Sequence, residues 1–125
     1  MITFKIEIND ANNYMIALTD DNESVGYLTY DYADDDSNKR NINLDFLYIN
    51  HEYRKQGIGT KMINHLISLN PHVTWFSFWT GKEIEKNNGT AFHDKLGFKK
   101  VYYQEDYYEK GVGTTLYVKR INKDN

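Results

Sequence analysis

The chain has 125 residues, 40% of them hydrophobic and 26% charged, which suits one globular domain and excludes a two-domain enzyme. Its formal net charge of -3 leaves no basic excess to neutralise nucleic-acid phosphates, so nucleic-acid binding is disfavoured. Cysteine is absent, which excludes disulfides and thiolate zinc sites, and we expect no metal. The first residues do not form a signal peptide and no later run resembles a membrane span, so we expect a cytoplasmic protein.

Apolar and polar residues alternate through most of the first 49 residues, which is the pattern of half-buried β-strands. The alternation predicts four strands, at Ile2–Ile8, Tyr14–Thr19, Val25–Tyr32 and Ile42–Ile49. In the fourth strand we expect one apolar face and one mixed face, made respectively of Ile42, Leu44, Phe46 and Tyr48, and of Asn43, Asp45, Leu47 and Ile49. The connection between the first two strands, Asn9 to Tyr14, has room for a loop only.

The periodicity changes after the fourth strand. Apolar residues recur at helical spacing from Ile58 to Ile67, and Asn70-Pro71 ends that helix. The remaining elements are predicted as a strand, a helix and a final hairpin around Gly111–Gly113, at Val73–Thr80, Lys86–Leu96, Lys99–Tyr108 and Thr114–Ile121. The order ββββαβαββ predicts a single α/β domain with a mixed sheet over residues 1–125.

A glycine turn, Tyr53 to Lys61 (YRKQGIGTK), joins the fourth strand to the first helix. Amides at a helix start are unpaired and point outward, so such a turn favours a phosphate. Gly57 and Gly59 would permit positive φ and a close approach of the backbone to a ligand, and the side chains of Arg54 and Lys55 could add charge-assisted hydrogen bonds.

Other well-known motifs do not fit the same residues. A dinucleotide fingerprint needs glycine where Met62 stands, and a P-loop needs lysine before threonine, whereas the order here is Thr60-Lys61. His51-Glu52 lacks the second histidine of a zinc protease, because Lys55 stands at that position. A turn that binds nothing remains the alternative to a phosphate site.

The wider context resembles the GNAT superfamily of N-acyltransferases. Leu44 to Ile63 is similar to its acetyl-CoA site, with the signature R-x-x-G-x-G at Arg54, Gly57 and Gly59. Ala91 to Phe98 (AFHDKLGF) resembles its second signature, in which His93 stands where tyrosine is usual. The resemblance implies a GNAT-like fold, here with reduced N-terminal helices, because the Asn9 to Tyr14 connection cannot hold the two helices usual in the family.

The resemblance also implies how acetyl-CoA is held. The pantetheine arm is expected to pair with the backbone of Leu47, Tyr48 and Ile49, where an N–H faces the thioester oxygen. The pyrophosphate is then expected on the amides of Gln56, Gly57, Ile58, Gly59 and Thr60, beside Arg54. We interpret Asn87-Asn88 as a helix start near the cofactor, which adds Asn88 to the cofactor-binding residues.

Acid and base candidates follow from the same comparison. His93 is the candidate donor to the leaving thiolate, and the alternative is a histidine on a helix surface. Asp45, on the strand beside the thioester and on the face opposite Phe46, is the candidate base, with partial burial expected to strengthen it. A solvated aspartate is the alternative for Asp45, and weaker candidates are Tyr48, His51 and Glu52.

The leading hypothesis is an N-acetyltransferase that transfers acetyl from acetyl-CoA to a primary amine of a small molecule or protein, by direct attack in a ternary complex. The alternative is a non-catalytic module that binds acyl-CoA. Acidic groups at Asp20–Glu23 and Asp31–Asp36 are solvated loops or steer a cationic acceptor, and tyrosines 102, 103, 107 and 108 are candidates for lining an acceptor groove. In the family the two N-terminal helices help to wall the acceptor site, so their reduction implies an open acceptor side. We expect a second subunit, as in a homodimer, or a macromolecular substrate to cover it.

Overall fold

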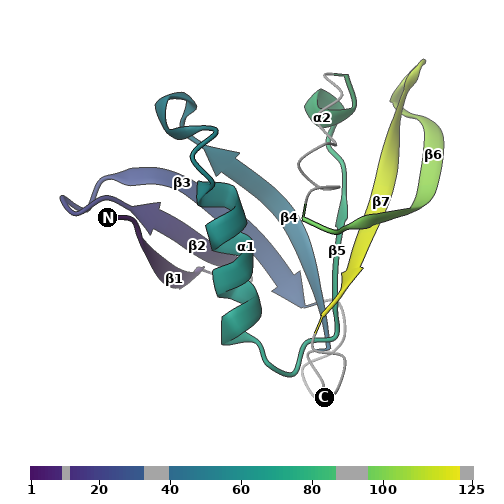
Figure 1. Cartoon of the computed structure of the whole chain (residues 1–125). Coiled ribbons are helices and arrows are strands. Elements are labelled where there is room, and N and C mark those ends of the chain that lie inside the picture. The colour runs from purple at the N-terminus through teal and green to yellow at the C-terminus, as the bar shows by residue number, and fades with distance from the viewer. Residues whose placement is uncertain (10–11, 33–39, 87–95, 122–125) are drawn as a thin grey trace.

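The structure is a computed structural model that describes residues 1–9, 12–32, 40–86 and 96–121. Its described strands form one sheet in the order β1-β2-β3-β4-β5-β7-β6 (Figure 1). The strands are β1 (Thr3–Asn9), β2 (Asn12–Leu18), β3 (Ser24–Tyr32), β4 (Asn41–Ile49), β5 (Trp75–Trp79), β6 (Lys99–Glu109) and β7 (Val112–Arg120). The helices are α1 (Ile58–Leu69) and α2 (Lys82–Lys86), and a single 3₁₀ turn, His51–Tyr53, follows β4. The predicted mixed α/β fold is therefore confirmed.

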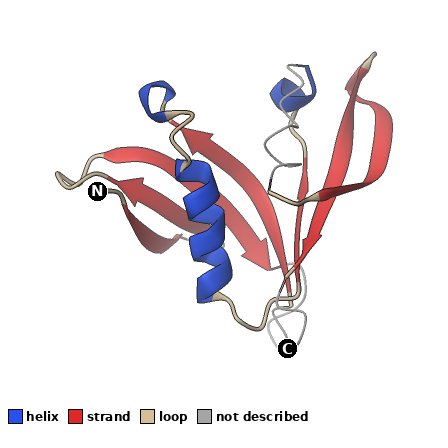
Figure 2. Cartoon of the chain, viewed as in Figure 1, coloured by secondary structure: helices blue, strands red, loops and turns tan. Residues whose placement is uncertain are grey.

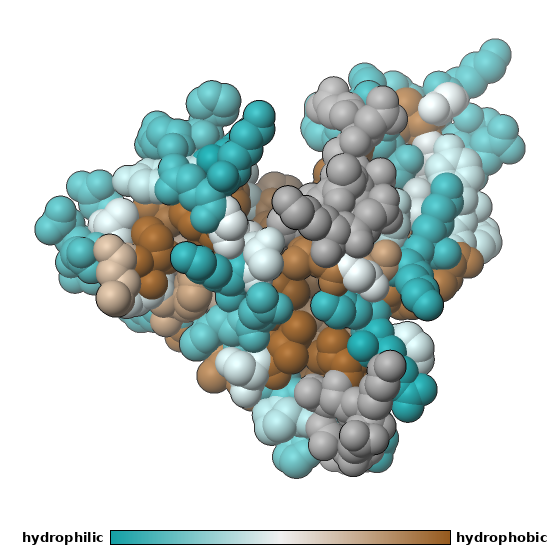
Figure 3. Space-filling model, viewed as in Figure 1, coloured by the Kyte–Doolittle hydropathy of each residue, from teal (hydrophilic) through white to brown (hydrophobic). Residues whose placement is uncertain are grey.

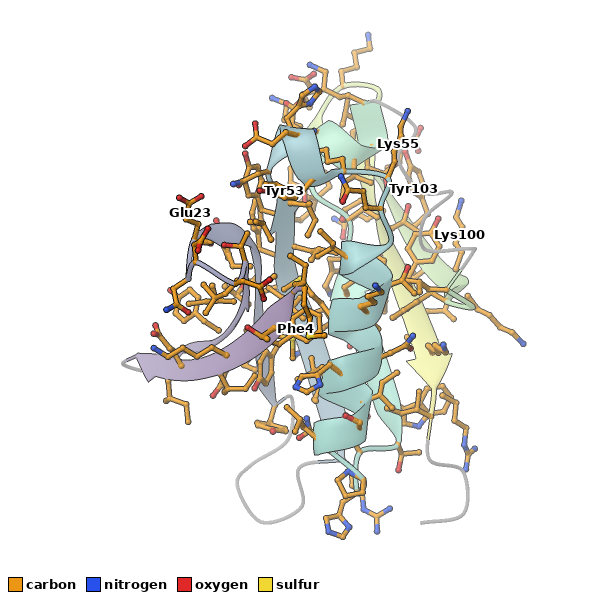
Figure 4. The ribbon with its side chains drawn as sticks, turned by 60° about the vertical axis from the view of Figure 1, so that its left-hand side comes forward. Phe4, Glu23, Tyr53, Lys55, Lys100 and Tyr103 are labelled. Atoms are coloured by element: carbon orange, nitrogen blue, oxygen red, sulfur yellow. The ribbon has the colours of Figure 1, made fainter. Side chains whose placement is uncertain are left out.

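Strands β1 to β4 pair antiparallel, each with its neighbour in the sequence. Between the end of β1 at Asn9 and the start of β2 at Asn12 the chain has two residues, so the connection holds no helix, as predicted. Helix α1 lies across one face of these strands (Figure 2). The ring of Phe4 in β1 lies 5.1 Å from that of His65 in α1, centroid to centroid, which ties the edge strand to the helix (Figure 4).

The core lies between α1 and this half of the sheet. Met62, Ile63 and Leu66 recur at helical spacing and are buried in one cluster with side chains of the strands, among them Met15, Leu28 and Ile42. Burying each such side chain is worth about 1.5–3 kcal/mol, so this contact fixes the position of α1. At the C-terminal end of α1, the hydroxyl of Tyr32 donates a 2.6 Å hydrogen bond to Oδ1 of Asn70. Burial raises the pKa of the Tyr32 hydroxyl above its usual value.

A β-bulge in β4 changes which residues face the core. Thr29 pairs with Phe46 and Tyr30 pairs with Leu44, so Asp45 is an extra residue without a partner on β3. Ile42 and Leu44 are buried before the bulge, whereas after it Leu47 and Ile49 pack against the core. Phe46 and Tyr48 are 51% and 40% exposed on the opposite face. The prediction that these two aromatics continue the buried face of Ile42 and Leu44 is therefore wrong, because the extra residue shifts the alternation by one.

The sheet divides between β4 and β5. The two strands pair in parallel only from Asn41 to Asn43 on β4, against Trp75 to Ser77 on β5. Beyond that point β4 and β5 diverge, whereas β5 pairs antiparallel with β7 on its other edge along its whole length (Figure 1). The space-filling view shows an indentation between the two halves of the molecule (Figure 3). The residues of β4 that follow the bulge therefore lie at a gap in the sheet.

The second half of the chain differs from its prediction in detail. Strand β5 begins at Trp75 instead of Val73, and β7 begins at Val112, so the hairpin turn is Lys110-Gly111. Helix α2 precedes the predicted helix Lys86–Leu96, most of which lies outside the described residues. The short α2 was missed because five residues carry too little periodicity to indicate a helix.

Replacing one buried and one exposed phenylalanine tests the bulge. Phe76 in β5 is fully buried, so Phe76→Ala should lower the free energy of unfolding by about 3–5 kcal/mol. Phe46→Ala should lower it by about 1 kcal/mol or less, because the ring loses mainly its stacking on Tyr27. Urea unfolding of the two variants measures both values. Equal losses would show that Phe46 belongs to the core and that β4 has no bulge at Asp45.

Candidate functional site

The start of α1, which follows β4 in the chain through the turn at residues 50–57, presents unpaired backbone amides. Gly57 caps the helix in the left-handed region at φ 78°, and no side chain caps the first turn. The N–H groups of Ile58, Gly59 and Thr60 therefore lack helical partners, and the helix dipole adds positive charge at this point. A Cβ built on Gly57 would meet no atom within 4 Å, so the space in front of these amides is open.

The second glycine of the turn does not use the positive φ that glycine permits. Gly59 lies inside the first turn of α1 and is buried, and its φ is not positive. The residue that shares the left-handed conformation with Gly57 is Lys55, at φ 63°. Gly59 is thus part of the helix, and Gly57 alone of the two provides the left-handed residue of the turn. Figure 4 shows Tyr53 and Lys55 in the segment that leads into α1.

The backbone of β4 beyond the bulge faces the gap. The N–H of Asn50 donates to the carbonyl of Val25 on β3 at 2.8 Å. Because N–H groups of successive strand residues point to opposite sides, those of Leu47 and Ile49 point away from β3. Pairing with β5 ends at Asn43, so no described strand receives them. These N–H groups are available to a ligand lying between β4 and β5.

The side chain of Arg54 contacts the end of β4 beside these N–H groups. Its Nε donates a 2.8 Å hydrogen bond to the carbonyl of Ile49, and its guanidinium carbon lies 5.6 Å from the ring centroid of Tyr48. The side chain therefore joins the turn before α1 to the end of β4. In this position Arg54 supports the backbone at the gap, besides carrying a positive charge near the helix start.

Of the candidate acid and base residues, the structure places Asp45 at the mouth of the gap. It is the bulged residue of β4, two positions after pairing with β5 ends, and its side chain is exposed. The partial burial predicted for Asp45 is therefore wrong. Asp45 and Phe46 also line one shared groove of the sheet. The prediction that Asp45 lies on the face opposite Phe46 is therefore wrong. Asn88 and His93 lie outside the described residues.

A buried polar network holds α2 against the other side of the gap. Thr80, which is fully buried after β5, donates its hydroxyl to the carboxylate of Glu85 in α2 and accepts a 2.8 Å bond from the N–H of Thr115 in β7. The hydroxyl of Thr115 donates to the same Glu85 oxygen at 2.7 Å. Sequence reasoning missed Glu85, because its partners are known only once β5 and β7 pair.

Ion pairs fasten the outer side of α2 to β6. Glu109 lies 3.1 Å from the ammonium of Lys82 and 3.4 Å from that of Lys86. The hydrogen bond from Lys82 and the two positive charges hold the pKa of Glu109 below its usual range. Together with the Glu85 network, these contacts fix α2 against β6 and β7.

The tyrosines of β6 only partly form the predicted groove. Tyr107 and Tyr108 line a pocket of about 250 Å³ together with Trp79, whereas Tyr102 and Tyr103 are not part of its lining. Tyr102 instead meets Trp79 edge to face at 5.9 Å. Within the described ranges there is no group of three metal-binding side chains. None of the described helices is long and apolar enough to cross a membrane.

Comparison with known proteins identifies the family. The chain matches the family model of the acetyltransferase (GNAT) domain over residues 11–100, which is more than half of its length. It therefore belongs to the GNAT acetyltransferase family, as its two sequence signatures indicated.

Two curated relatives share part of the sequence. The peptidyl-lysine N-acetyltransferase YjaB of Salmonella typhimurium (strain LT2) is 29% identical over 84 residues, which are 67% of this chain and 48% of that protein. The N-alpha-acetyltransferase 50 of Danio rerio is 30% identical over 59 residues, 46% of this chain and 35% of that protein. The chain thus spans half or less of the length of these relatives.

Solved structures share the fold at low sequence identity. A GNAT family acetyltransferase from Elizabethkingia anophelis with acetyl-CoA bound has a TM-score of 0.77 at 11% identity, over 96% of this chain and 98% of that one. An aminoglycoside 6'-N-acetyltransferase complexed with coenzyme A has a TM-score of 0.70 at 17% identity, over 90% and 74%. At these identities the likeness extends to the fold alone.

A valine at Gly57 tests the open space before α1, with Gly111 as the matched control. Both glycines have positive φ, 78° and 84°, and a Cβ on either meets nothing within 4 Å. Gly57→Val and Gly111→Val should therefore strain the backbone alike, but only Gly57→Val should project a side chain into the pyrophosphate position. By calorimetry we expect acetyl-CoA to bind Gly57→Val at least about 10-fold more weakly than Gly111→Val. Equal affinities would exclude this turn as the phosphate site.

Proposed function

We propose that the protein is an N-acetyltransferase that transfers acetyl from acetyl-CoA to a primary amine, by direct attack of the amine on the thioester. The observations that carry the proposal are the gap between β4 and β5, which opens after Asn43, and the unpaired amides at the start of α1. The two relatives, named as a peptidyl-lysine N-acetyltransferase and an N-alpha-acetyltransferase, support a protein amine as the acceptor.

The backbone of β4 is proposed to bind and polarise the donor. When bound, acetyl-CoA supplies an activated acyl group with a thiolate leaving group. The N–H groups of Leu47 and Ile49 point into the gap, where one of them is suited to the thioester oxygen as it gains negative charge. The amides of Gln56 to Thr60 are proposed to hold the pyrophosphate, whose charge suits a helix start. Gln56 also donates its side-chain amide to the carbonyl of Glu52 at 3.3 Å, which restrains the turn.

Proton transfer is assigned to two side chains, Asp45 and His93. A primary amine must lose a proton during attack, and Asp45 at the mouth of the gap is the proposed acceptor, directly or through water. The departing thiolate needs a donor, which we assign to His93 on its position in the second family signature. Asn88 is proposed to contribute to cofactor binding on the same ground.

Substitution of Asp45 tests turnover separately from binding. Asp45→Asn keeps the shape of the side chain but removes its basicity, so kcat should fall about 100-fold while the affinity for acetyl-CoA is unchanged. Glu105→Gln, which removes an exposed carboxylate from β6, should retain the wild-type rate. Release of free thiol from acetyl-CoA, followed with a panel of amines, measures both rates. A wild-type rate in Asp45→Asn would remove Asp45 from the chemistry.

Substitution of His93 tests the donor and separates an enzyme from a binding module. His93→Ala should lower kcat about 100-fold, and His93→Tyr, which restores the residue usual in the family, should recover much of the rate. The pH profile should change in His93→Tyr, because a phenol with a pKa of about 10 stays protonated where imidazole titrates. If the wild type binds acetyl-CoA but releases no thiol with any amine, the chain is a non-catalytic acyl-CoA-binding module.

A further inference from the structure

The face of β1–β4 that is turned away from α1 carries a groove of about 730 Å³. Met15, Ala17 and Leu28 point into the core beneath α1, so the residues that alternate with them face the other side. One row of directly paired residues crosses this groove, with one member from each strand: Glu7, Tyr14, Thr29 and Phe46. Beside this row, Ile16 pairs with Tyr27, and the ring of Tyr27 stacks on that of Phe46 at 5.8 Å between centroids.

The length of the groove suits a short stretch of polypeptide. Neighbouring strands lie about 4.8 Å apart, so the row from Glu7 on β1 to Phe46 on β4 spans about 14 Å. An extended chain advances about 3.3–3.6 Å per residue, and about four residues cover this distance. A small monoamine would fill only one end of the groove.

The charge of the groove is concentrated at its β4 end. Glu7, at the β1 end, is paired with the ammonium of Lys5 at 3.1 Å. Asp45, at the other end, is exposed and forms no ion pair with any residue in the described parts of the chain. Between them the lining is aromatic and aliphatic, mainly Tyr14, Ile16, Tyr27 and Phe46. A ligand that matches this pattern has one cationic end and an apolar body.

The β4 end of the groove is also the end beside the gap. Asp45 and Phe46 lie two and three residues after Asn43, the last residue of β4 that pairs with β5. An amine held at Asp45 therefore lies next to the backbone to which the thioester was assigned, and the apolar body extends towards β1. This step rests on the proposed function.

The kind of amine follows from its protonation. A peptide α-amine has a pKa of about 7.7–8.0 and is about half neutral at pH 8, whereas a lysine with a pKa of about 10.4 is about 0.4% neutral. Asp45 is exposed to water, and an amine that is about half neutral at pH 8 makes a smaller demand on it than one that is almost fully protonated. We infer that the acceptor is the N-terminal segment of a polypeptide, with its α-amine at Asp45 and about four apolar residues along the groove.

Acetylation of defined peptides tests the acceptor. The tetrapeptide amide Leu-Phe-Val-Gly should be acetylated with a kcat/KM at least about 10-fold higher than that of Ser-Gly-Ser-Gly, because only its side chains bury apolar surface on the groove. Its kcat/KM should also exceed that of phenylethylamine and that of a peptide that is blocked at its N-terminus and offers an internal lysine. Equal rates for the two tetrapeptides, or a preference for the lysine peptide or for phenylethylamine, would overturn the inference.

Substitutions at two residues of nearly equal exposure locate the binding surface. Phe46 and Leu69 are 51% and 49% exposed, and only Phe46 lines the groove. Phe46→Ala should raise KM for the Leu-Phe-Val-Gly amide about 10-fold and leave KM for acetyl-CoA unchanged, whereas Leu69→Ala should change neither. A higher KM for the peptide amide in Tyr102→Ala, with no change in Phe46→Ala, would place the acceptor on the aromatic side chains of β6 and overturn the inference.

The outcomes separate this inference from the proposed function. If no amine is acetylated, the proposed function fails. If amines are acetylated without regard to apolar N-terminal residues or to Phe46, the function stands and the inference alone fails. If light scattering gives a dimer in the wild type and a monomer in Phe46→Glu, the groove is an interface between two copies of the chain, and the inference also fails.

Discussion

The site depends on the short parallel ladder between β4 and β5. Three residues on each strand pair, from Asn41 to Asn43, and this is enough to hold the two halves of the sheet together at one end. The bulge at Asp45 follows directly, and bulges increase local twist and end regular pairing. Because β5 diverges from β4 after Asn43, the N–H groups of Leu47 and Ile49 find no partner strand among the described residues. A sheet paired along its whole length would have no place for a donor between its strands.

The same bulge links the donor site to the acceptor groove. By shifting the alternation, it turns Phe46 and Tyr48 outward and leaves Leu47 and Ile49 to pack against the core. The outward aromatics then form part of the groove face, and Tyr48 also supports Arg54. In addition, the two-residue connection between β1 and β2 leaves that face without a helix over the described residues. One extra residue in β4 therefore shapes both sides of the proposed reaction.

Local patterns predicted the elements, and long-range pairing decided the site. Periodicity was sufficient for β1 to β4 and for α1, because each alternates against a single buried face. The faces of Phe46 and Tyr48 were predicted wrongly, because a bulge is defined by the register of the partner strand and leaves no signal in β4 itself. Glu85 was missed for a similar reason, since its partners Thr80 and Thr115 meet only when β5 and β7 pair. The turn at Gly57 was predictable because unpaired amides at a helix start are a local property.

Amide hydrogen exchange of the backbone, measured by NMR with and without acetyl-CoA, tests the central claim most directly. The claim is that the unpaired N–H groups of β4 and of the start of α1 bind the donor. We therefore expect acetyl-CoA to slow exchange at Leu47 or Ile49 and at Ile58 to Thr60, while the already paired amides of β2 and β3 change little. Slowed exchange confined to other parts of the sheet, with none at Leu47, Ile49 or the first turn of α1, would contradict the account.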